Sequence, residues 1–468
     1  MTKVVTDYFK VESFQSSSLS LLEGDFRLNA EYYTHDNNFS LPTHIITEKL
    51  SEIANVIGFG PFKRYYIDNI KYGVPLISSS EMMELNPSCE GIISKELVRD
   101  YKKYLVKEKT ILVSCSGTIG KITLVDSRLV NKAISQHALR VIPNNSERTG
   151  LIYTFLNSDY GQSIITGKKS GAVIDEIYAG DLNIIEIPII NNSAIKKLNT
   201  LIIAAFEKRD SANEILENAQ SLVLKFNNLP HFSESEIDVL KVSNEIELLN
   251  TNLSEFTTDF RLDAHFYNTL AELAVRNIEA FSKRYESLYE VADCSFKGSR
   301  STRNYVDKAH GVPFLSGKNI IQIRPDFKYI STTETSNLNE MLVEKNQILI
   351  SRSGTLGRTV FVWNNYEDFA ASEHLIRVVP NSDLVDEGYL YAFLSSDYGY
   401  HQLLRYKHGS VIDEITEDQI SQSLIPLPSD KQQKQIGDLV RQGYDLRAEA
   451  IRLEDEAQTL LTQALTKE

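Results

Sequence analysis

The chain has 468 residues, of which 42% are hydrophobic and 24% charged, and its formal net charge is −14 at pH 7. This composition is that of a globular protein of two or three domains, which argues against disordered and fibrous classes. The acidity argues against a free-standing DNA binder, because phosphate neutralisation requires basic residues, so any DNA-binding surface has to be local or shared with a partner.

No segment predicts a membrane span, a secretory signal or a metal site. Apolar runs such as 182–190 fall far short of the roughly 20 residues that a membrane helix needs. The first ten residues carry Lys3, Asp7 and Lys10 without an apolar signal core. The three cysteines are far apart and lack the spacing of zinc ligands or of a disulfide framework. We therefore expect a cytoplasmic protein with no metal and no membrane attachment.

After an N-terminal segment, residues 1–24, the sequence predicts a first globular domain over residues 25–193. Short runs typical of strands lie at 110–114, 122–125 and 138–142, and a helical stretch lies at 151–158. We expect an α/β (α+β) fold.

A single long helix is predicted over residues 194–229. Positions seven apart hold alanine or a large aliphatic residue, as in a coiled-coil heptad: Leu198, Ala205, Ala212 and Ala219, with a companion series that includes Leu201 and Leu222. At about 1.5 Å per residue the stretch 198–229 measures about 48 Å, which is longer than a small domain needs.

A linker, residues 230–258, leads to a second domain over residues 259–428 that repeats the first at an offset of 234 to 238 residues. Strand-like runs recur at 347–351, 359–363 and 375–379, and a helical stretch at 389–396. Six ordered blocks match: 25–28 with 259–262, 73–75 with 311–313, 114–120 with 351–357, 137–143 with 374–380, 155–161 with 393–399, and 171–177 with 409–415.

Between these blocks the two copies diverge. The stretch 58–72 has little in common with 297–310, and 78–103 has little in common with 316–339. A shared frame with different inserts is what a protein needs to recognise two different targets with one scaffold. We therefore expect an asymmetric target in two parts.

The chain ends in a second predicted helix, residues 429–468, with the same heptad character. Its seam residues are Leu439, Leu446, Ala450, Leu453, Ala457, Leu460 and Ala464. Alanine seams let backbones approach closely, so we predict that the two helices pair as an antiparallel coiled coil. The alternative is that each helix packs only on its own domain.

No motif predicts a catalytic site. The loop 117–121 lacks the Walker A pattern, because Cys115 and Ile122 stand where glycine and serine or threonine are needed. The acidic pairs at 175–176 and 413–414 are expected in strands, where neighbours point to opposite faces. His137 and His374 recur without a recurring nucleophile. No methyltransferase signature is present, and we expect no enzyme and no cofactor of its own.

Basic and aromatic residues gather in the divergent inserts and beside the repeated Ser-Gly-Thr loops. Arginine and lysine bind phosphates, and arginine or asparagine can read base edges. One such cluster is more often a solvated face, but clusters in the divergent parts of both copies favour DNA binding. The candidate DNA-binding residues are Lys63, Arg64, Tyr65, Lys95, Arg99, Lys102, Lys103, Lys121, Lys297, Arg300, Arg303, Tyr305, Lys318, Asn319, Arg352 and Arg358.

Three motifs together resemble the specificity subunits of Type I restriction-modification systems. They are the block 343–358, the Asp-Phe-Arg-Leu-Asp-Ala-His-Phe-Tyr opening from Asp259, and Ile-Pro-Leu-Pro at 425–428 followed by Gln432-Gln433 and a long helix. The order of target recognition domain and helix, twice over, also matches. The first copy departs from the pattern: it lacks the Pro-Leu-Pro and Gln-Gln features, and Cys115 replaces Arg352.

The resemblance implies that each recognition domain reads one half of a bipartite DNA site, while the helices set the spacer and dock two methyltransferase subunits. Restriction subunits, with motor and nuclease activity, would be further partners on double-stranded DNA. S-adenosylmethionine and ATP with magnesium would belong to those partners. Two alternatives stay open: a specificity component of another methylation-based phage-defence system, and an interaction scaffold that does not bind DNA.

Overall fold

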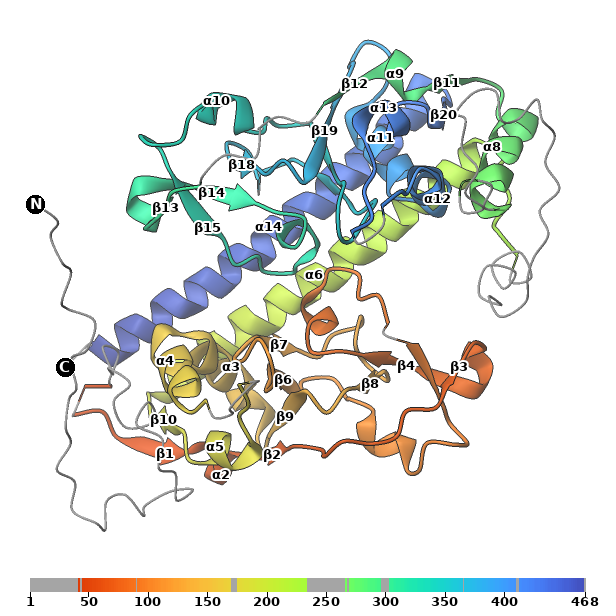
Figure 1. Cartoon of the computed structure of the whole chain (residues 1–468). Coiled ribbons are helices and arrows are strands. Elements are labelled where there is room, and N and C mark those ends of the chain that lie inside the picture. Colours follow the sequence, from red (N-terminus) through yellow and green to blue (C-terminus); the bar gives the residue numbers. More distant parts are fainter. Residues whose placement is uncertain are drawn as a thin grey trace, which may run out of the picture. The chain divides into compact units, whose positions relative to one another are not determined.

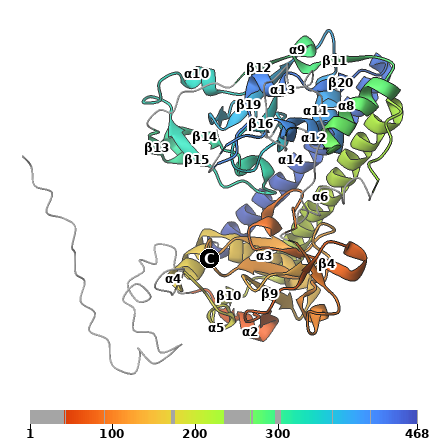
Figure 2. The ribbon, with the colours of Figure 1, turned by 45° about the vertical axis from the view of Figure 1, so that its right-hand side comes forward.

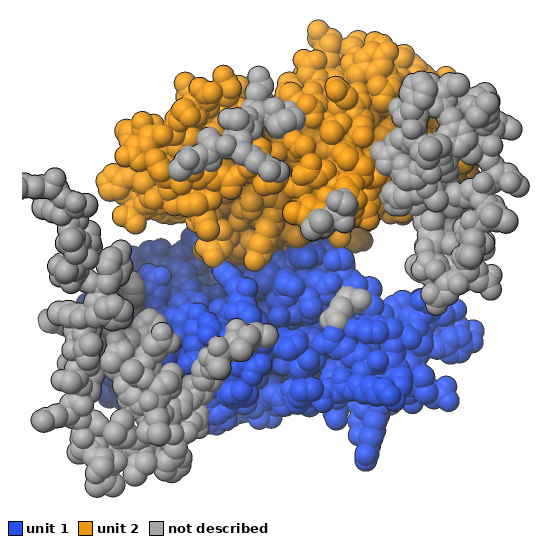
Figure 3. All heavy atoms as spheres, in the orientation of Figure 1, with its two compact units in different colours: residues 1–206, 452–468 blue, residues 207–451 orange. Residues whose placement is uncertain are grey.

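The computed structural model describes residues 41–42, 44–89, 91–169, 175–233, 266, 269–295, 303–364, 366–409 and 412–466. The chain forms two compact units: unit 1 comprises residues 1–206 and 452–468, and unit 2 comprises residues 207–451 (Figure 3). The predicted N-terminal segment 1–24, most of the linker 230–258, and the repeat blocks 25–28 and 259–262 lie outside the described residues.

Unit 1 contains two four-stranded sheets and a two-stranded ribbon (Figure 1). Their strands, in spatial order, are β2 (Ala54–Ile57), β9 (Ala138–Pro143), β6 (Ile111–Ser114) and β7 (Ile122–Leu124) in one sheet, β3 (Tyr66–Ile67), β5 (Gly91–Ser94), β4 (Gly73–Ile77) and β8 (Ala133–Ile134) in the other, and β1 (Thr47–Lys49) with β10 (Glu186–Pro188) in the ribbon. The helices of the globular part are α2 (Leu50–Ile53), α3 (Thr149–Asn157), α4 (Asp159–Gly167) and α5 (Ala179–Asn183).

The central strand β6 is buried on both faces, which explains its unbroken apolar sequence. Ile111 and Val113 face a core that includes the almost fully buried helix α3, and Leu112 faces a second, smaller core. This alternation follows from the two-residue period of a strand. The sheet therefore separates two hydrophobic cores within this unit.

Unit 2 repeats this plan strand for strand. Its sheets are β12 (Ala292–Ser295), β19 (Leu375–Pro380), β16 (Ile348–Ser351) and β17 (Thr359–Phe361); β13 (Tyr305–Val306), β15 (Lys328–Ser331), β14 (Gly311–Leu315) and β18 (Ala370–Ala371); and the ribbon β11 (Tyr285–Ser287) with β20 (Leu424–Pro426). Its helices are α8 (Thr269–Phe281), α9 (Leu288–Val291), α10 (Leu338–Met341), α11 (Glu387–Leu394), α12 (Asp397–Arg405) and α13 (Glu417–Ile420). The predicted mixture of strands and helices is confirmed in both copies.

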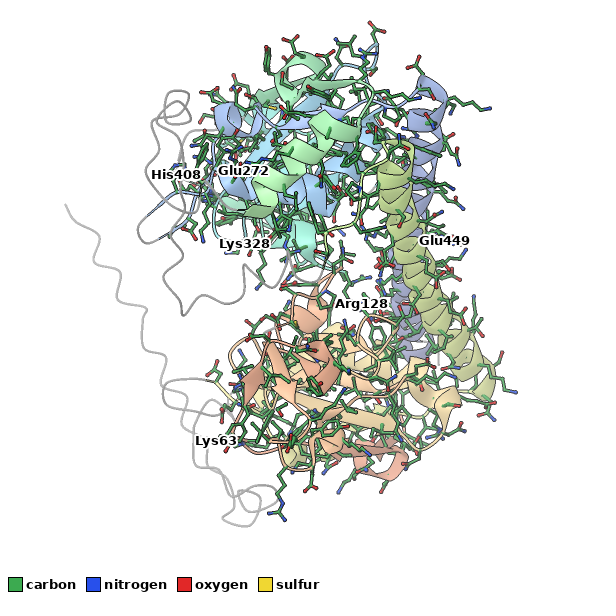
Figure 4. The ribbon with its side chains drawn as sticks, turned by 90° about the vertical axis from the view of Figure 1, so that its right-hand side faces the viewer. Lys63, Arg128, Glu272, Lys328, His408 and Glu449 are labelled. Atoms are coloured by element: carbon green, nitrogen blue, oxygen red, sulfur yellow. The ribbon has the colours of Figure 1, made fainter. Side chains whose placement is uncertain are left out.

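Two long helices, α6 (Asn192–Phe226) and α14 (Asp430–Thr466), each contribute to both units (Figure 2). In unit 1, Lys197 Nζ lies 3.5 Å from Glu456 Oε1. In unit 2, Lys208 Nζ lies 2.9 Å from Glu449 Oε2, a residue marked in Figure 4, and Arg447 Nη2 donates to Asn213 Oδ1 over 3.1 Å. Within unit 2, numbering therefore rises along α6 as it falls along α14.

The alanine positions of both helices are buried, but the companion positions lie one residue away from those predicted. Ala205, Ala212, Ala219, Ala450 and Ala457 are fully buried, and Ala464 is half-buried. The buried companions are Ile202, Arg209, Leu216 and Val223 in α6, and Val440, Arg447, Glu454 and Leu461 in α14.

Of the predicted leucines, Leu198 continues the alanine series and the others border this stripe. Leu198 and Leu201 are buried, whereas Leu222, Leu439, Leu446, Leu453 and Leu460 are half-buried. The reason is that steps of three and four residues from each alanine are both compatible with a helix face. Two of the three polar residues, Glu454 and Arg447, have partners inside the fold: Tyr153 donates to Glu454 over 2.7 Å, and Asn213 accepts from Arg447. In the described part of the chain, no helix has the length and apolar character to cross a bilayer.

Candidate nucleic-acid interface

The repeated Ser-Gly-Thr segment is a tight turn between two strands in each unit. Ser114 Oγ accepts from the Lys121 backbone N–H (2.8 Å) and donates to the Thr118 carbonyl (2.6 Å), and Ser351 makes the same two bonds to Arg358 and Thr355. The glycines of the first turn have φ of +72° and +83°, a region that disfavours side chains. The turn joins strand to strand, so it is not a phosphate loop that opens a helix.

In unit 1, Arg64 links the divergent insert to the part of the domain that is repeated in both copies. Its Nη2 donates to Gln136 Oε1 over 3.0 Å and its Nη1 donates to Tyr66 Oη over 3.3 Å. Gln136 Nε2 also lies 2.9 Å from His137 Nε2. The guanidinium lies over the Phe62 ring, 5.9 Å from its centroid. The side chain is therefore held by a polar bond at its tip and an aromatic face beside it.

In unit 2, Arg303 occupies the corresponding place. Its Nη2 contacts both carboxylate oxygens of Glu373, and its guanidinium lies 4.8 Å from the Phe314 ring centroid. His374 Nε2 lies 3.5 Å from Glu373, and its Nδ1 lies 2.7 Å from Ser353 Oγ. Desolvation opposes the charge of Arg303, but hydrogen bonds to Tyr305 and Glu373 and the attraction of Glu373 together outweigh it and raise the pKa of Arg303.

Ser353 corrects one expectation, because a hydroxyl does lie beside one of the repeated histidines. The trio of Ser353, His374 and Glu373 nevertheless differs from a hydrolase triad: Glu373 is neutralised by Arg303, and unit 1 has the amide of Gln136 in its place. The acidic pairs are not in strands either. Glu176 forms an isolated bridge with Ser116, and Glu414 forms isolated bridges with Ser353 and His408.

Lysines sit on aromatic rings near both arginines, and two of them are marked in Figure 4. Lys63 Nζ lies 4.7 Å from the Tyr65 ring centroid, and Lys328 Nζ lies 4.8 Å from that of Tyr305. Sequence reasoning missed Lys328, as it missed Gln136 and Glu373. The available signal was position: Gln136 and Glu373 directly precede the repeated histidines.

The other candidates of unit 1 occupy its surface. Lys95 Nζ donates to the Lys71 carbonyl over 3.3 Å. Arg99 is 95% exposed and lies 3.7 Å from Asp100. Lys102 and Lys103 lie exposed on one short turn, where Lys103 covers the Tyr104 ring at 5.0 Å. These cations form a surface suited to phosphate rather than a set of fixed base readers.

In unit 2 the candidates divide by burial. Lys318 is exposed, whereas its neighbour Asn319 is buried, accepts from the Ser316 backbone N–H (3.0 Å) and donates to the Asp326 carbonyl (2.9 Å). Asn319 thus closes a turn instead of presenting its amide to a base. Arg352 lies 3.6 Å from Glu414, and Arg358 lies 5.8 Å from the Tyr400 ring centroid. Lys297 and Arg300 lie outside the described residues.

The described residues hold no group of three histidine, cysteine or acidic side chains that could bind a metal ion. Cys115 is buried, and burial raises the pKa of its thiol to about 11. Burial likewise raises the pKa of Cys294 to about 12. Both thiols are therefore protonated at neutral pH and are poor nucleophiles.

Comparison with known proteins gives matches over both copies. The family model described as Type I restriction modification DNA specificity domain matches residues 46–223 and 286–454. Among solved structures, the chain is similar to the HsdS subunit from Thermoanaerobacter tengcongensis, at 15% identity over 92% of this chain and 98% of that one, with a TM-score of 0.29. It is also similar to the Type-I restriction-modification system S subunit from M. genitalium, at 15% identity over 91% and 96%, with a TM-score of 0.27.

Proposed function

This chain belongs to the Type I restriction modification DNA specificity family, and from that premise we propose that its two recognition domains each read one half of a bipartite, asymmetric DNA site. The observation that carries the proposal is the double match of the family model to two segments with the same sheets and different inserts. Because the two domains have the same sheets, we expect both to bind a DNA duplex in the same orientation. The inserts then give each domain its own sequence preference.

We propose the basic and aromatic residues of the inserts as the DNA-binding surface. The proposal is supported by cations stacked on rings in both copies. The exposed members are Lys63, Lys95, Arg99, Lys102 and Lys103 in the first domain and Tyr305, Lys318 and Lys328 in the second; the half-buried members are Arg64, Tyr65, Lys121, Arg303, Arg352 and Arg358. The net charge of −14 opposes DNA binding by this chain alone. Partner subunits would supply the remaining phosphate contacts.

We further propose that α6 and α14 pair as an antiparallel coiled coil that sets the spacer between the half-sites and docks two methyltransferase subunits. Support comes from the ion pairs and buried alanines within each unit. Methylation with S-adenosylmethionine and ATP-driven cleavage with magnesium would be the chemistry of the methyltransferase and restriction subunits. The chain itself would contribute recognition and no catalysis.

The test exchanges residues 30–190 with those of another member of the family, in a complex co-expressed with its methyltransferase. Methylome sequencing should show that one half of the recognised site changes and the other half stays. A simultaneous change of both halves would contradict independent reading. If the unexchanged complex shows no salt-dependent, sequence-selective binding to DNA, the chain is instead a scaffold that does not read DNA.

A further inference from the structure

The same polar constellation occurs once in each unit. Arg64 and Tyr66 recur as Arg303 and Tyr305 at an offset of 239 residues, and Gln136 and His137 recur as Glu373 and His374 at an offset of 237. Both arginines come from the divergent inserts, and both contact the residue that precedes the repeated histidine. The two inserts differ in sequence, yet each places an arginine against the residue that precedes the repeated histidine.

The two constellations differ in charge. Arg64 is held by the neutral amide of Gln136, whereas Arg303 is paired with the carboxylate of Glu373. The side chains of Arg303 and Glu373 are 30% and 13% exposed, so the pair is accessible from one side. A neutralised pair attracts a phosphate weakly, but it still presents N–H groups in fixed directions. Such a fork matches two adjacent acceptors, and the O6 and N7 atoms of guanine are the acceptors that arginine most often reads.

A second difference lies beside the arginines. Position 91 in unit 1 corresponds to position 328 in unit 2. A Cβ atom at Gly91 would lie 2.5 Å from the Tyr66 ring, so the ring lies directly against this backbone. In unit 2 the same place holds Lys328, whose ammonium group covers the Tyr305 ring. Lys328 has no neighbouring carboxylate among its described contacts, so its charge suits a phosphate.

Resting on the proposed function, we propose that Arg64 and Arg303 each read a guanine, one in each half-site, through the major-groove edge of the base. Gln136 and Glu373 are positioning residues that fix the direction of each guanidinium. Lys328 adds a phosphate contact that is peculiar to the second half-site. The assignment divides one small site into base reading and backbone binding, which respond differently to salt.

The experiment uses the complete complex with its methyltransferase partner, a library of duplexes randomised in both half-sites, and binding measured at several salt concentrations. Arg303→Met should lower the preference for guanine at one position of the second half-site by about 5- to 150-fold. The dependence of binding on salt should stay unchanged when Arg303→Met is combined with Glu373→Gln, because the double variant keeps the net charge of the pair. Arg64→Met should lower the preference for guanine at one position of the first half-site and, because its partner Gln136 is neutral, should also reduce the salt slope.

The matched control is Lys328→Ala, which should weaken binding to all sequences alike. It should reduce the slope of log affinity against log salt by about one and retain the guanine preference. Glu373→Gln, which copies unit 1, should keep the guanine preference and steepen the salt slope. Glu373→Leu should lose the preference although Arg303 is present, a result that a purely structural role for Glu373 does not predict.

The half-site that is not mutated reports on folding and assembly in the same molecule, because its sequence preference should be intact. Uniform weakening by the Arg303→Met, Glu373→Gln double variant, with the guanine preference retained, would overturn the assignment and make the arginine a phosphate clamp. Failure of the proposed function is separate: the wild-type complex itself would then show no sequence preference in either half.

Discussion

Each unit has an arginine at the same place in its sheet, the buried Arg140 on β9 and the half-buried Arg377 on β19. Arg140 donates to the carbonyls of Ile134 (2.8 Å), Ala138 (3.3 Å) and Tyr104 (3.3 Å), and lies 4.4 Å from the Phe59 ring centroid. Burial lowers the pKa of Arg140 to about 10, so the residue remains charged at neutral pH. Arg377 in unit 2 is less buried and donates to the carbonyls of Glu340 and Met341.

We expect Arg140→Met to destabilise the protein by about 3 kcal/mol, because it leaves three buried carbonyls without a donor. Arg377→Met should cost less, since water can reach that site and fewer bonds are lost. Urea unfolding monitored for both variants gives the comparison. Equal costs for the two substitutions would show that the carbonyl bonds of Arg140 contribute little.

Individual site residues are the part of the structure that the sequence predicts least well. Clustering indicated Arg64 and Arg303, but their partners Gln136 and Glu373 stand 70 or more positions away, and only the fold brings them together. Asn319 was predicted to bind DNA because asparagine can read adenine. In the structure its amide is used up by the turn that it closes.

At the level of single elements, a strand or helix is predicted correctly where its residue pattern fits only one structure. The strand-like runs form β6, β7, β9 and their copies. In β6 and β16 three buried apolar residues followed by a buried serine suit a central strand. The heptad of the long helices had two solutions. Alanine fixed one position, but the choice between Leu453 and Glu454 depended on Tyr153, which lies about 300 residues away and offers a partner to the carboxylate.

The buried alanines give a test within unit 1. Ala457→Leu should destabilise this unit by roughly 1 to 3 kcal/mol, because the added side chain has no room in a close-packed core. Ala464→Leu, two turns further along the same face, is the matched control and should cost less, since Ala464 is half-buried. Thermal unfolding distinguishes the two, and equal melting temperatures would place Ala457 at a loosely packed site.

At the scale of the whole molecule, the length of the helices should set the spacing of the half-sites. Four residues advance a helix by about 6 Å and turn it by about 40°, and one base pair adds about 3.4 Å and about 35°. A matched insertion of four residues near Ala212 and Ala450 should therefore lengthen the unspecified spacer by about one base pair. Both half-sites should stay the same.

Seven inserted residues should impair activity more, although they keep the heptad. They advance the helix by about 10 Å, close to three base pairs, but turn it by about −20° where the DNA turns by about 100°. Methylation mapped on targets with varied spacers gives the readout for both insertions. An unchanged spacer after the four-residue insertion would show that the helices do not measure the site.

Unit 1 is assembled from two parts of the chain that are far apart in sequence, and this sets the order of events during synthesis. Leu198 and Ile202 share their core with Ala457, Leu461 and Leu465, near the end of the chain. While the ribosome is still making unit 2, the face of α6 that belongs to unit 1 has no covering helix. Its apolar stripe stays uncovered until residues 452–466 have been made. A nascent chain that stops before residue 452 would therefore leave the first-made unit with an incomplete core.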